Sequence, residues 1–283
     1  MIDATSNNPE FRALIKFWGV RGTTPTPGLE YLQHGGNTAC VEVRLADGQI
    51  LIFDAGTGAR RLGQSLMREH GQRPLAVKCF LSHFHWDHIQ GIPFFAPLYS
   101  AAAEVKFYSI REPDEVRRTL EGQMLKPYFP VDFDYMSADR VFVKLDDRGL
   151  NCDELAVHAF PLNHPQGAVG YRVEYRGATI VYASDLEHGH ASLDRVVREY
   201  ARGADILIYD AQFTPQEYEG RRGWGHSTWL EATRVARDSG VKQLVLIHHD
   251  PEHDDSTLSR IVNDACEEFE DTSAAVEGTC FAV

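Results

Sequence analysis

Four side chains that commonly bind transition metals stand within six residues of this chain, directly after a strand-like apolar run. The run ends at Leu81, and the cluster that follows it reads His83-Phe84-His85-Trp86-Asp87-His88. Because alternate side chains of an extended chain point the same way, His83 and His85 face one side, and the next turn brings Asp87 and His88 to a neighbouring position. A single ion rarely takes four ligands from one loop, whereas two ions close together use them all. The sequence therefore predicts a site for two divalent cations, with Zn²⁺ favoured and Mn²⁺ or Fe as alternatives.

Strand-like and helical segments are mixed along both halves of the chain. Apolar runs typical of strands lie at 14–18, 40–45, 50–53, 75–81, 169–175, 179–183, 206–209 and 244–247. Helical patterns lie at 58–70, 193–200, 228–238 and 257–269. Thr228 with Glu231 predicts a capping box, and Gly240 predicts the end of that helix. The mixture predicts one layered α/β domain over residues 1–283, with sheets inside and helices outside.

The stretch from about 99 to 149 differs from the rest. A charged helical piece at 112–121 precedes an aromatic run at 124–130, and the two prolines of that run exclude a helix interior or a central strand. We expect an insertion here, and leave open whether it is a surface segment, a lid over the site or a dimer contact. As a lid it would bring Lys126, Tyr128 and Phe129 to a substrate for phosphate contact and base stacking.

The composition limits the partners of the protein. Its 283 residues include 41 acidic and 28 basic side chains, a formal net charge of −13. Binding a nucleic-acid backbone draws on Lys and Arg, so we expect no long nucleic acid as partner, whereas a small phosphate ester held by a metal stays compatible with this charge.

The same composition bears on location. No apolar stretch is long enough for a membrane span, and the polar residues Met1 to Glu10 lack the order of a secretion signal. The five cysteines are widely spaced with no C-x-x-C pair, as in a reducing compartment. We therefore expect a cytoplasmic protein without a membrane partner, and leave a monomer or a homodimer open.

The pattern H-x-H-x-D-H resembles the signature of the metallo-β-lactamase superfamily, and further motifs of that superfamily follow in order. Asp54, at a strand end before Gly56, resembles its first motif. His164, Asp185 and His248 resemble its third-motif ligand, its bridging carboxylate and its last histidine. The resemblance implies a metal-dependent hydrolase with a four-layer αβ/βα sandwich, in which two mixed sheets are flanked by helices.

The resemblance also implies a role for each of these residues. Seven side chains would hold the two ions: His83, His85 and His164 the first, Asp87, His88 and His248 the second, and Asp185 both. His249 is the alternative to His248, which we favour because the superfamily's ligand follows directly on the strand. Asp54 would orient a ligand imidazole, with a plain turn residue as the alternative.

Two further motif pairs resemble the ribonuclease Z-like, cyclic-phosphodiesterase-like branch of the superfamily. They are 210–214 with 225–228, and 17–23 with the glycine-containing run 35–40. In that branch an acidic residue and a histidine lie beside the metals. The resemblance implies that His226 gives a proton to the leaving oxygen, that Asp210 orients it, and that Asp87 takes a proton from the nucleophile. A helix-capping neighbour without a catalytic part is the alternative for His226.

The length of one segment bears on the substrate. Ribonuclease Z commonly carries a tRNA-clamping arm between the third-motif histidine and the bridging aspartate, and here only 20 residues separate His164 from Asp185. We therefore expect a phosphodiesterase that acts on a small or cyclic diester through a hydroxide held by two metals. The alternatives are a thioester, lactone or other ester hydrolase of the superfamily and, less favoured, a tRNA 3′ endonuclease. A binding protein that has lost catalysis is disfavoured because no ligand is missing.

Overall fold

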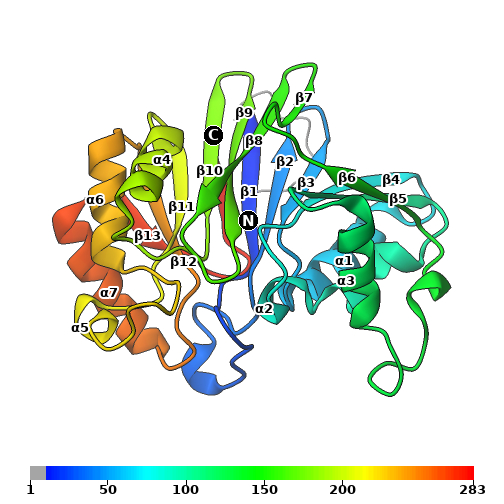
Figure 1. Cartoon of the computed structure of the whole chain (residues 1–283), viewed down its shortest axis with the longest axis horizontal. Coiled ribbons are helices and arrows are strands. Elements are labelled where there is room, and N and C mark those ends of the chain that lie inside the picture. Colours follow the sequence, from blue (N-terminus) through cyan, green and yellow to red (C-terminus); the bar gives the residue numbers. More distant parts are fainter. Residues whose placement is uncertain (1–10) are drawn as a thin grey trace.

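Two β-sheets lie face to face at the centre of the protein, and helices cover their outer surfaces (Figure 1). The computed structural model describes residues 11–283, so the expectation about Met1 to Glu10 lies outside the described residues. Among those residues the strands form two sheets of seven strands each. This arrangement is the αβ/βα sandwich that the sequence predicted.

The first sheet has the strand order β14-β1-β2-β3-β4-β5-β6. Its strands are β1 (Ala13–Gly19), β2 (Cys40–Leu45), β3 (Ile50–Phe53), β4 (Leu75–Phe80), β5 (Ala103–Ser109), β6 (Asp139–Lys144) and β14 (Cys280–Ala282). β3 to β6 are parallel, whereas β14, β1, β2 and β3 pair antiparallel. All four residues of β3 are buried, as its continuous apolar run predicted for a strand covered on both faces.

The second sheet has the order β13-β12-β11-β10-β9-β8-β7. Its strands are β7 (Leu150–Cys152), β8 (Leu155–Leu162), β9 (Ala168–Tyr175), β10 (Ala178–Ala183), β11 (Ile206–Asp210), β12 (Gln243–Ile247) and β13 (Thr272–Ala274). β7 to β10 form antiparallel hairpins, and β10 to β13 are parallel. Each sheet is therefore mixed, with an antiparallel part and a parallel part.

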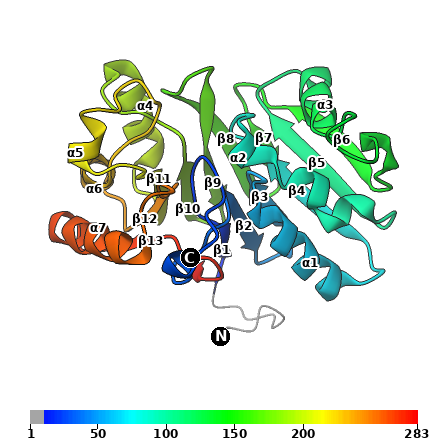
Figure 2. The ribbon, with the colours of Figure 1, turned by 90° about the horizontal axis from the view of Figure 1, so that it is seen from below.

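Helices flank the two sheets on opposite sides (Figure 2). α1 (Gly58–His70) and α3 (Pro113–Gly122) cover the first sheet, and α4 (Ala191–Ala201), α6 (Trp229–Ser239) and α7 (Asp255–Glu268) cover the second. The shorter helices are α2 (Trp86–Ile89), α5 (Pro215–Tyr218), and the 3₁₀ turns η1 (Leu29–Tyr31), η2 (Ile92–Phe94), η3 (Ala96–Tyr99) and η4 (Phe133–Tyr135). In the part of the chain that the structure describes, no helix is both long and apolar enough to cross a bilayer.

The ends of α6 test the predicted caps. The Thr228 hydroxyl accepts a hydrogen bond from the backbone N–H of Glu231, and Gly240 ends the helix in the left-handed conformation with a φ of 62°. The Glu231 carboxylate instead accepts from Arg198 at 2.7 Å. Only half of the predicted capping box therefore forms, because the side chain of Glu231 has an ionic partner on α4.

The core between the two sheets joins both halves of the chain. Phe53 of β3 stacks on Phe80 of β4 at 5.3 Å and contacts Tyr171 and Tyr182 of the second sheet at 5.5 and 5.7 Å. Burial of such aromatic surface is a main source of stability in a protein of this size. Two further apolar clusters pack the outer face of each sheet against its helices.

The stretch 99–149 is not the insertion that the sequence suggested. β5 and β6 lie within it and pair in parallel as strands of the first sheet, and α3 connects them. The prediction was wrong because β5, with the sequence AEVKFYS, alternates charged and apolar residues and lacks the apolar run of its neighbours. Only the connection 123–138 between α3 and β6 has little regular structure.

Candidate metal centre

The expected site residues follow strands that end at the same edge of the two sheets. Asp54 follows β3, Asp185 follows β10 and His248 follows β12, and each of the three has a left-handed backbone, with φ of 58°, 62° and 63°. This conformation is uncommon for residues other than glycine and is held where surrounding contacts fix it, often at functional sites. The left-handed conformation turns the chain sharply after each strand, so each of these three side chains lies close to the end of its strand.

The first group of potential ligands is His83, His85 and His164. Their ligand atoms lie within 4.8 Å of one another, and Nε2 of His164 is 3.1 Å from Nδ1 of His85. Nε2 of His83 is buried and has no hydrogen-bond partner, whereas its Nδ1 bonds the Ser82 hydroxyl at 3.0 Å. A buried imidazole nitrogen without a partner is costly unless an ion takes its lone pair.

The second group is Asp87, His88, Asp185 and His248, all of them buried. The Nε2 atoms of His88 and His248 face each other at 3.4 Å. Asp87 lies 3.2 Å from Nε2 of His248, and Asp185 lies 3.0 Å from Nε2 of His88. Imidazole nitrogens that converge on carboxylates in a dry site are the donor set of a divalent cation. The residues of both groups therefore fit the metal ions that the sequence predicted.

The electrostatics of the two groups differ in the metal-free chain. Burial lowers the pKa of His83 well below its usual value and also lowers the pKa of His164, so both rings are neutral with a free lone pair. Burial acts in the same direction on His248, but neighbouring carboxylates, Asp185 first, outweigh it and raise the pKa of His248 to about 9. In the second group, the positive charge of a protonated histidine therefore offsets the carboxylates when no cation is bound.

Asp54 lies behind this second group and bonds one of its ligands. Its fully buried carboxylate accepts hydrogen bonds from Nδ1 of His88 at 2.7 Å, from the Tyr182 hydroxyl at 2.8 Å, and from both the N–H and the hydroxyl of Ser82 at 2.8 and 2.7 Å. The bond fixes the proton of His88 on Nδ1 and leaves Nε2 free for a metal. Asp54 therefore contacts an expected ligand, as the predicted orienting role requires, and that role stays a prediction.

The sequence analysis missed two groups that hold the ligands. The Gln212 side chain bonds Nδ1 of His248 at 3.0 Å, and the backbone N–H of Thr23 donates to Asp87 at 2.8 Å. Gln212 lies within the motif 210–214, so its position could have suggested this role, whereas a backbone donor such as Thr23 leaves no mark in a sequence. His249 bonds the Ala275 carbonyl at 3.0 Å, so the structure brings His248 and not His249 into the group.

His226 and Asp210 form a pair beside the second group. Nδ1 of His226 lies 2.9 Å from Asp210, and its ring stacks on that of His248 with centroids 4.7 Å apart. Asp210 is fully buried and also accepts from the N–H of Asp185 and of Ser227, each at 3.1 Å. The His226 side chain keeps 12% of its surface exposed, so it can meet a substrate.

The three expected substrate contacts lie apart from these groups. Phe129 packs on Phe94 with ring centroids 5.7 Å apart, and the Tyr128 side chain is 83% exposed. Lys126 is exposed as well. A hollow of about 80 Å³ adjoins His83 and His85, and its lining includes Arg111 rather than any of these three residues. Their contact with a substrate stays a prediction.

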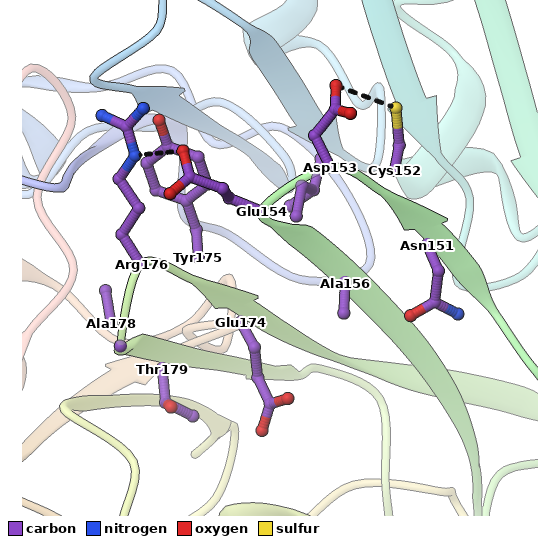
Figure 3. Close-up of a pocket in the computed structure, with 12 residues that line it drawn as sticks. Asn151, Cys152, Asp153, Glu154, Ala156, Glu174, Tyr175, Arg176, Ala178 and Thr179 are labelled. Carbon is purple, nitrogen blue, oxygen red and sulfur yellow. Dashed lines mark hydrogen bonds and ion pairs between the residues drawn. The ribbon is translucent and has the colours of Figure 1, made fainter.

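A second pocket, of about 500 Å³, lies at the tips of the hairpins β7–β8 and β9–β10 (Figure 3). An ion pair between Arg176 and Glu154 at 2.6 Å lies across it. Its residues stand where β8 and β10 begin, whereas His164 and Asp185 follow the ends of these strands. The pocket is therefore at the edge of the sheet opposite to the expected metal ligands and contains no expected site residue.

Comparisons with known proteins cover most of the chain. The sequence model of a family described as "Beta-lactamase superfamily domain" matches residues 49–249. A ribonuclease Z of Streptococcus suis is 26% identical, over 83% of this chain and 90% of that protein. Among solved structures, the metallo-beta-lactamase fold protein YhfI from Bacillus subtilis has a TM-score of 0.71 at 18% identity and covers 97% of this chain and 100% of its own. A diphosphatase from the PhnP family has a TM-score of 0.69 at 18% identity, with 96% and 98% covered.

Proposed function

This chain belongs to the metallo-β-lactamase superfamily as a ribonuclease Z-like hydrolase, and on that premise we propose that it hydrolyses phosphodiesters at a centre of two divalent metal ions. The ribonuclease Z-like resemblance supports hydrolysis as the reaction. The finer assignment depends on the residues beside the metal ligands, because the ligands alone do not distinguish a phosphodiester from a thioester or a lactone.

The observation that carries the proposal is the His226–Asp210 pair next to His248. A departing alkoxide is a strong base and needs a proton, whereas a departing thiolate does not. Asp210 keeps Nδ1 of His226 engaged, so that Nε2 is the atom that gives the proton. A proton donor held in this way favours an ester with a poor leaving group, as in a nucleotide or another alkyl phosphate.

The proposed roles of the other residues follow the two groups. His83, His85 and His164 would hold one ion, Asp87, His88 and His248 the other, and Asp185 both. When bound, the ions supply Lewis acidity toward the phosphate oxygens and activate a water molecule as nucleophile. Zn²⁺ is the ion that this donor set favours, with Mn²⁺ or Fe as alternatives. Asp87 would accept a proton from the nucleophile, and Asp54 keeps His88 in the binding tautomer.

A small or cyclic diester is the substrate that the fold favours. β9 ends at Tyr175 and β10 begins at Ala178, so only two residues connect them and no arm rises between His164 and Asp185. The net charge of −13 also favours a small substrate, because it disfavours binding of a long nucleic-acid backbone. The relatives named ribonuclease Z weigh against the expectation that no long nucleic acid binds, and they make tRNA 3′ cleavage the second candidate.

A substrate panel distinguishes these candidates. It would contain bis(p-nitrophenyl) phosphate, 2′,3′- and 3′,5′-cyclic nucleotides, a precursor tRNA and a thioester, assayed on one preparation whose metal content is measured. We expect turnover of the activated diester and of a cyclic nucleotide, with two metal ions per chain. Cleavage of the precursor tRNA alone would replace the substrate assignment, and turnover of the thioester alone would contradict the phosphodiesterase proposal.

Two variants test the proposed residues in the same assays. Asp87→Ala should lower diester turnover by about 10²–10⁴-fold without unfolding the chain, because it removes both a metal ligand and a proton acceptor. Asp147→Ala, at an exposed aspartate, serves as its control. His226→Ala should lower turnover of the cyclic nucleotide, whose alkoxide leaving group needs a proton, and spare any thioester turnover. The proposal fails if Asp87→Ala keeps wild-type activity, or if His226→Ala has the opposite selectivity.

A further inference from the structure

Glu187 holds the loop that carries His226. Its carboxylate accepts hydrogen bonds from the backbone N–H of Gly223 at 2.7 and 2.9 Å and from the N–H of Gly225 at 2.9 Å. Both glycines have a positive φ, 87° and 89°, so the loop adopts a conformation that glycine tolerates and that needs an external partner for its N–H groups. His226 is the next residue along the chain.

A tyrosine completes the contacts of this carboxylate. The Tyr218 hydroxyl donates to Glu187 at 3.0 Å. Burial, followed by this hydrogen bond, raises the pKa of Tyr218 to about 12, so the hydroxyl keeps its proton and remains a donor. Both carboxylate oxygens of Glu187 are therefore engaged by donors of 218–225.

The backbone of Glu187 is attached to the segment of the first ligand group. Its N–H donates to the Asn163 carbonyl at 2.7 Å, and the Asn163 side-chain amide donates to the Glu187 carbonyl at 2.9 Å. Asn163 precedes His164, and Glu187 follows Asp185 by two residues. Glu187 thus connects three segments that are far apart in the sequence and that each carry a residue of the site.

The loop that Glu187 holds acts directly on two histidines. The Gly225 carbonyl accepts the Nδ1 proton of His164 at 2.8 Å, which leaves Nε2 of His164 free for a metal. A Cβ atom at Gly225 would lie 2.3 Å from Pro165 Cδ and 2.5 Å from His164 Nδ1, so the backbone is in close contact with the ligand. A shift of the loop would therefore move His226 and at the same time break the hydrogen bond that keeps the proton of His164 on Nδ1.

We propose that Glu187 is a positioning residue of the reaction, which fixes the His226 proton donor against the metal centre through the amides of Gly223 and Gly225. The proposal rests on the proposed function, because it concerns the proton that the leaving group needs. It assigns to Glu187 no contact with a substrate or a metal. Its effect is predicted to depend on the leaving group, which a role in stability alone would not produce.

The first test is amide hydrogen exchange on the metal-free protein without substrate. In Glu187→Ala we expect the amides of Gly223 and Gly225 to exchange about tenfold faster or more, because they lose their acceptor. Glu187→Gln should give an intermediate effect, since its amide keeps one acceptor oxygen. Glu219→Ala removes an exposed acid near the loop and should leave the exchange unchanged. Unchanged exchange in Glu187→Ala would overturn the proposal whether or not the protein is a phosphodiesterase.

The second test compares two leaving groups at measured metal content. p-Nitrophenolate leaves without a proton, whereas the alkoxide of a cyclic nucleotide needs one. In Glu187→Gln, which keeps the size of the side chain, we expect kcat for the cyclic nucleotide to fall at least ~10-fold more than kcat for bis(p-nitrophenyl) phosphate. Equal losses would overturn the positioning role. If the wild type hydrolyses neither substrate, the proposed function fails, and the exchange experiment still decides whether Glu187 holds the loop.

Discussion

Asp54 illustrates at the residue scale how a buried charge is kept in place. It has no exposed surface, and four donors from three residues surround its two oxygens. A carboxylate without such partners would be strongly destabilising at this depth. One of these bonds holds Nδ1 of His88, so the residue that satisfies the buried polar groups also contacts an expected metal ligand.

Asp54→Asn should weaken metal binding while keeping the fold. The amide preserves the size of the side chain but is neutral, so the hydrogen bond that holds the Nδ1 proton of His88 is weaker than the bond to a carboxylate. We expect metal affinity to fall by about 10–100-fold, measured by competition with a chelating dye. Asp147→Asn, at an exposed aspartate, is the control and should bind as the wild type does. Unchanged affinity in Asp54→Asn would show that His88 is oriented by other contacts.

The connection after β1 contributes to the site at the scale of elements. Its backbone pairs with the segment after β12, since the N–H of Gly22 donates to the His249 carbonyl at 3.0 Å. Gly22 also lies against the His248 ring, and a Cβ atom there would be 2.3 Å from its Cε1 and Nδ1. The absence of a side chain at Gly22 therefore leaves the space that the imidazole occupies.

Gly22→Ala should displace His248 through this contact alone, because Gly22 does not have a left-handed backbone. We expect about 10²-fold lower diester turnover together with reduced metal content, since small displacements of a reacting group have effects of this size. Metal analysis and kinetics on the same sample measure both. Gly122→Ala has no atom within 4 Å of the added Cβ and should leave both values unchanged. Normal metal content in Gly22→Ala would mean that the ring has room to move.

At the scale of the whole molecule, the centre depends on both sheets. His83 and Asp87 follow β4 of the first sheet, whereas His164, Asp185 and His248 follow strands of the second. Cations bound between the two sheets would raise the free energy of unfolding, because they bind the folded chain and not the unfolded one. Without cations, protons on His88 and His248 offset the nearby carboxylates, and for both rings the carboxylates raise the pKa although burial alone would lower it.

Metal removal should therefore cost more stability as the pH rises. The pKa of His248 in the folded metal-free protein is about 9, above its ordinary value. Protonation of His248 therefore stabilises the metal-free fold fully below that ordinary value, and this stabilisation is lost as the pH rises through 9. We expect the difference in Tm between metal-loaded and metal-free protein to increase from pH 7 to pH ~9.5, measured by calorimetry. His190→Gln, at an exposed histidine, should show the same increase. A Tm difference that does not change with pH would contradict the idea that protonated His248 stabilises the metal-free protein in place of a cation.

Patterns local to the chain predicted most elements, and a few elements depended on their neighbours. Continuous apolar runs located β3, β4, β11 and β12, because a strand buried on both faces needs apolar residues throughout. β5 and β6 were missed because their exposed or half-buried positions carry polar residues such as Glu104 and Lys106. The alternation of apolar and charged residues in β5 is the weaker signal of a half-buried strand, and pairing with β4 places β5 in the sheet.

The sequence by itself predicted a layered α/β domain and a cluster of metal-binding side chain types, because these follow from short-range periodicity and residue chemistry, and its resemblance to the superfamily added the order of the expected ligands and the sandwich of two mixed sheets. Only the tertiary structure decided which backbone and side-chain groups hold the expected ligands and the loop before His226. The N–H of Thr23, the carbonyl of Gly225 and the carboxylate of Glu187 act across 64, 61 and 36 to 38 residues of chain. A backbone donor is the same in every residue, so its partner is set by the packing of the two sheets and not by the local sequence.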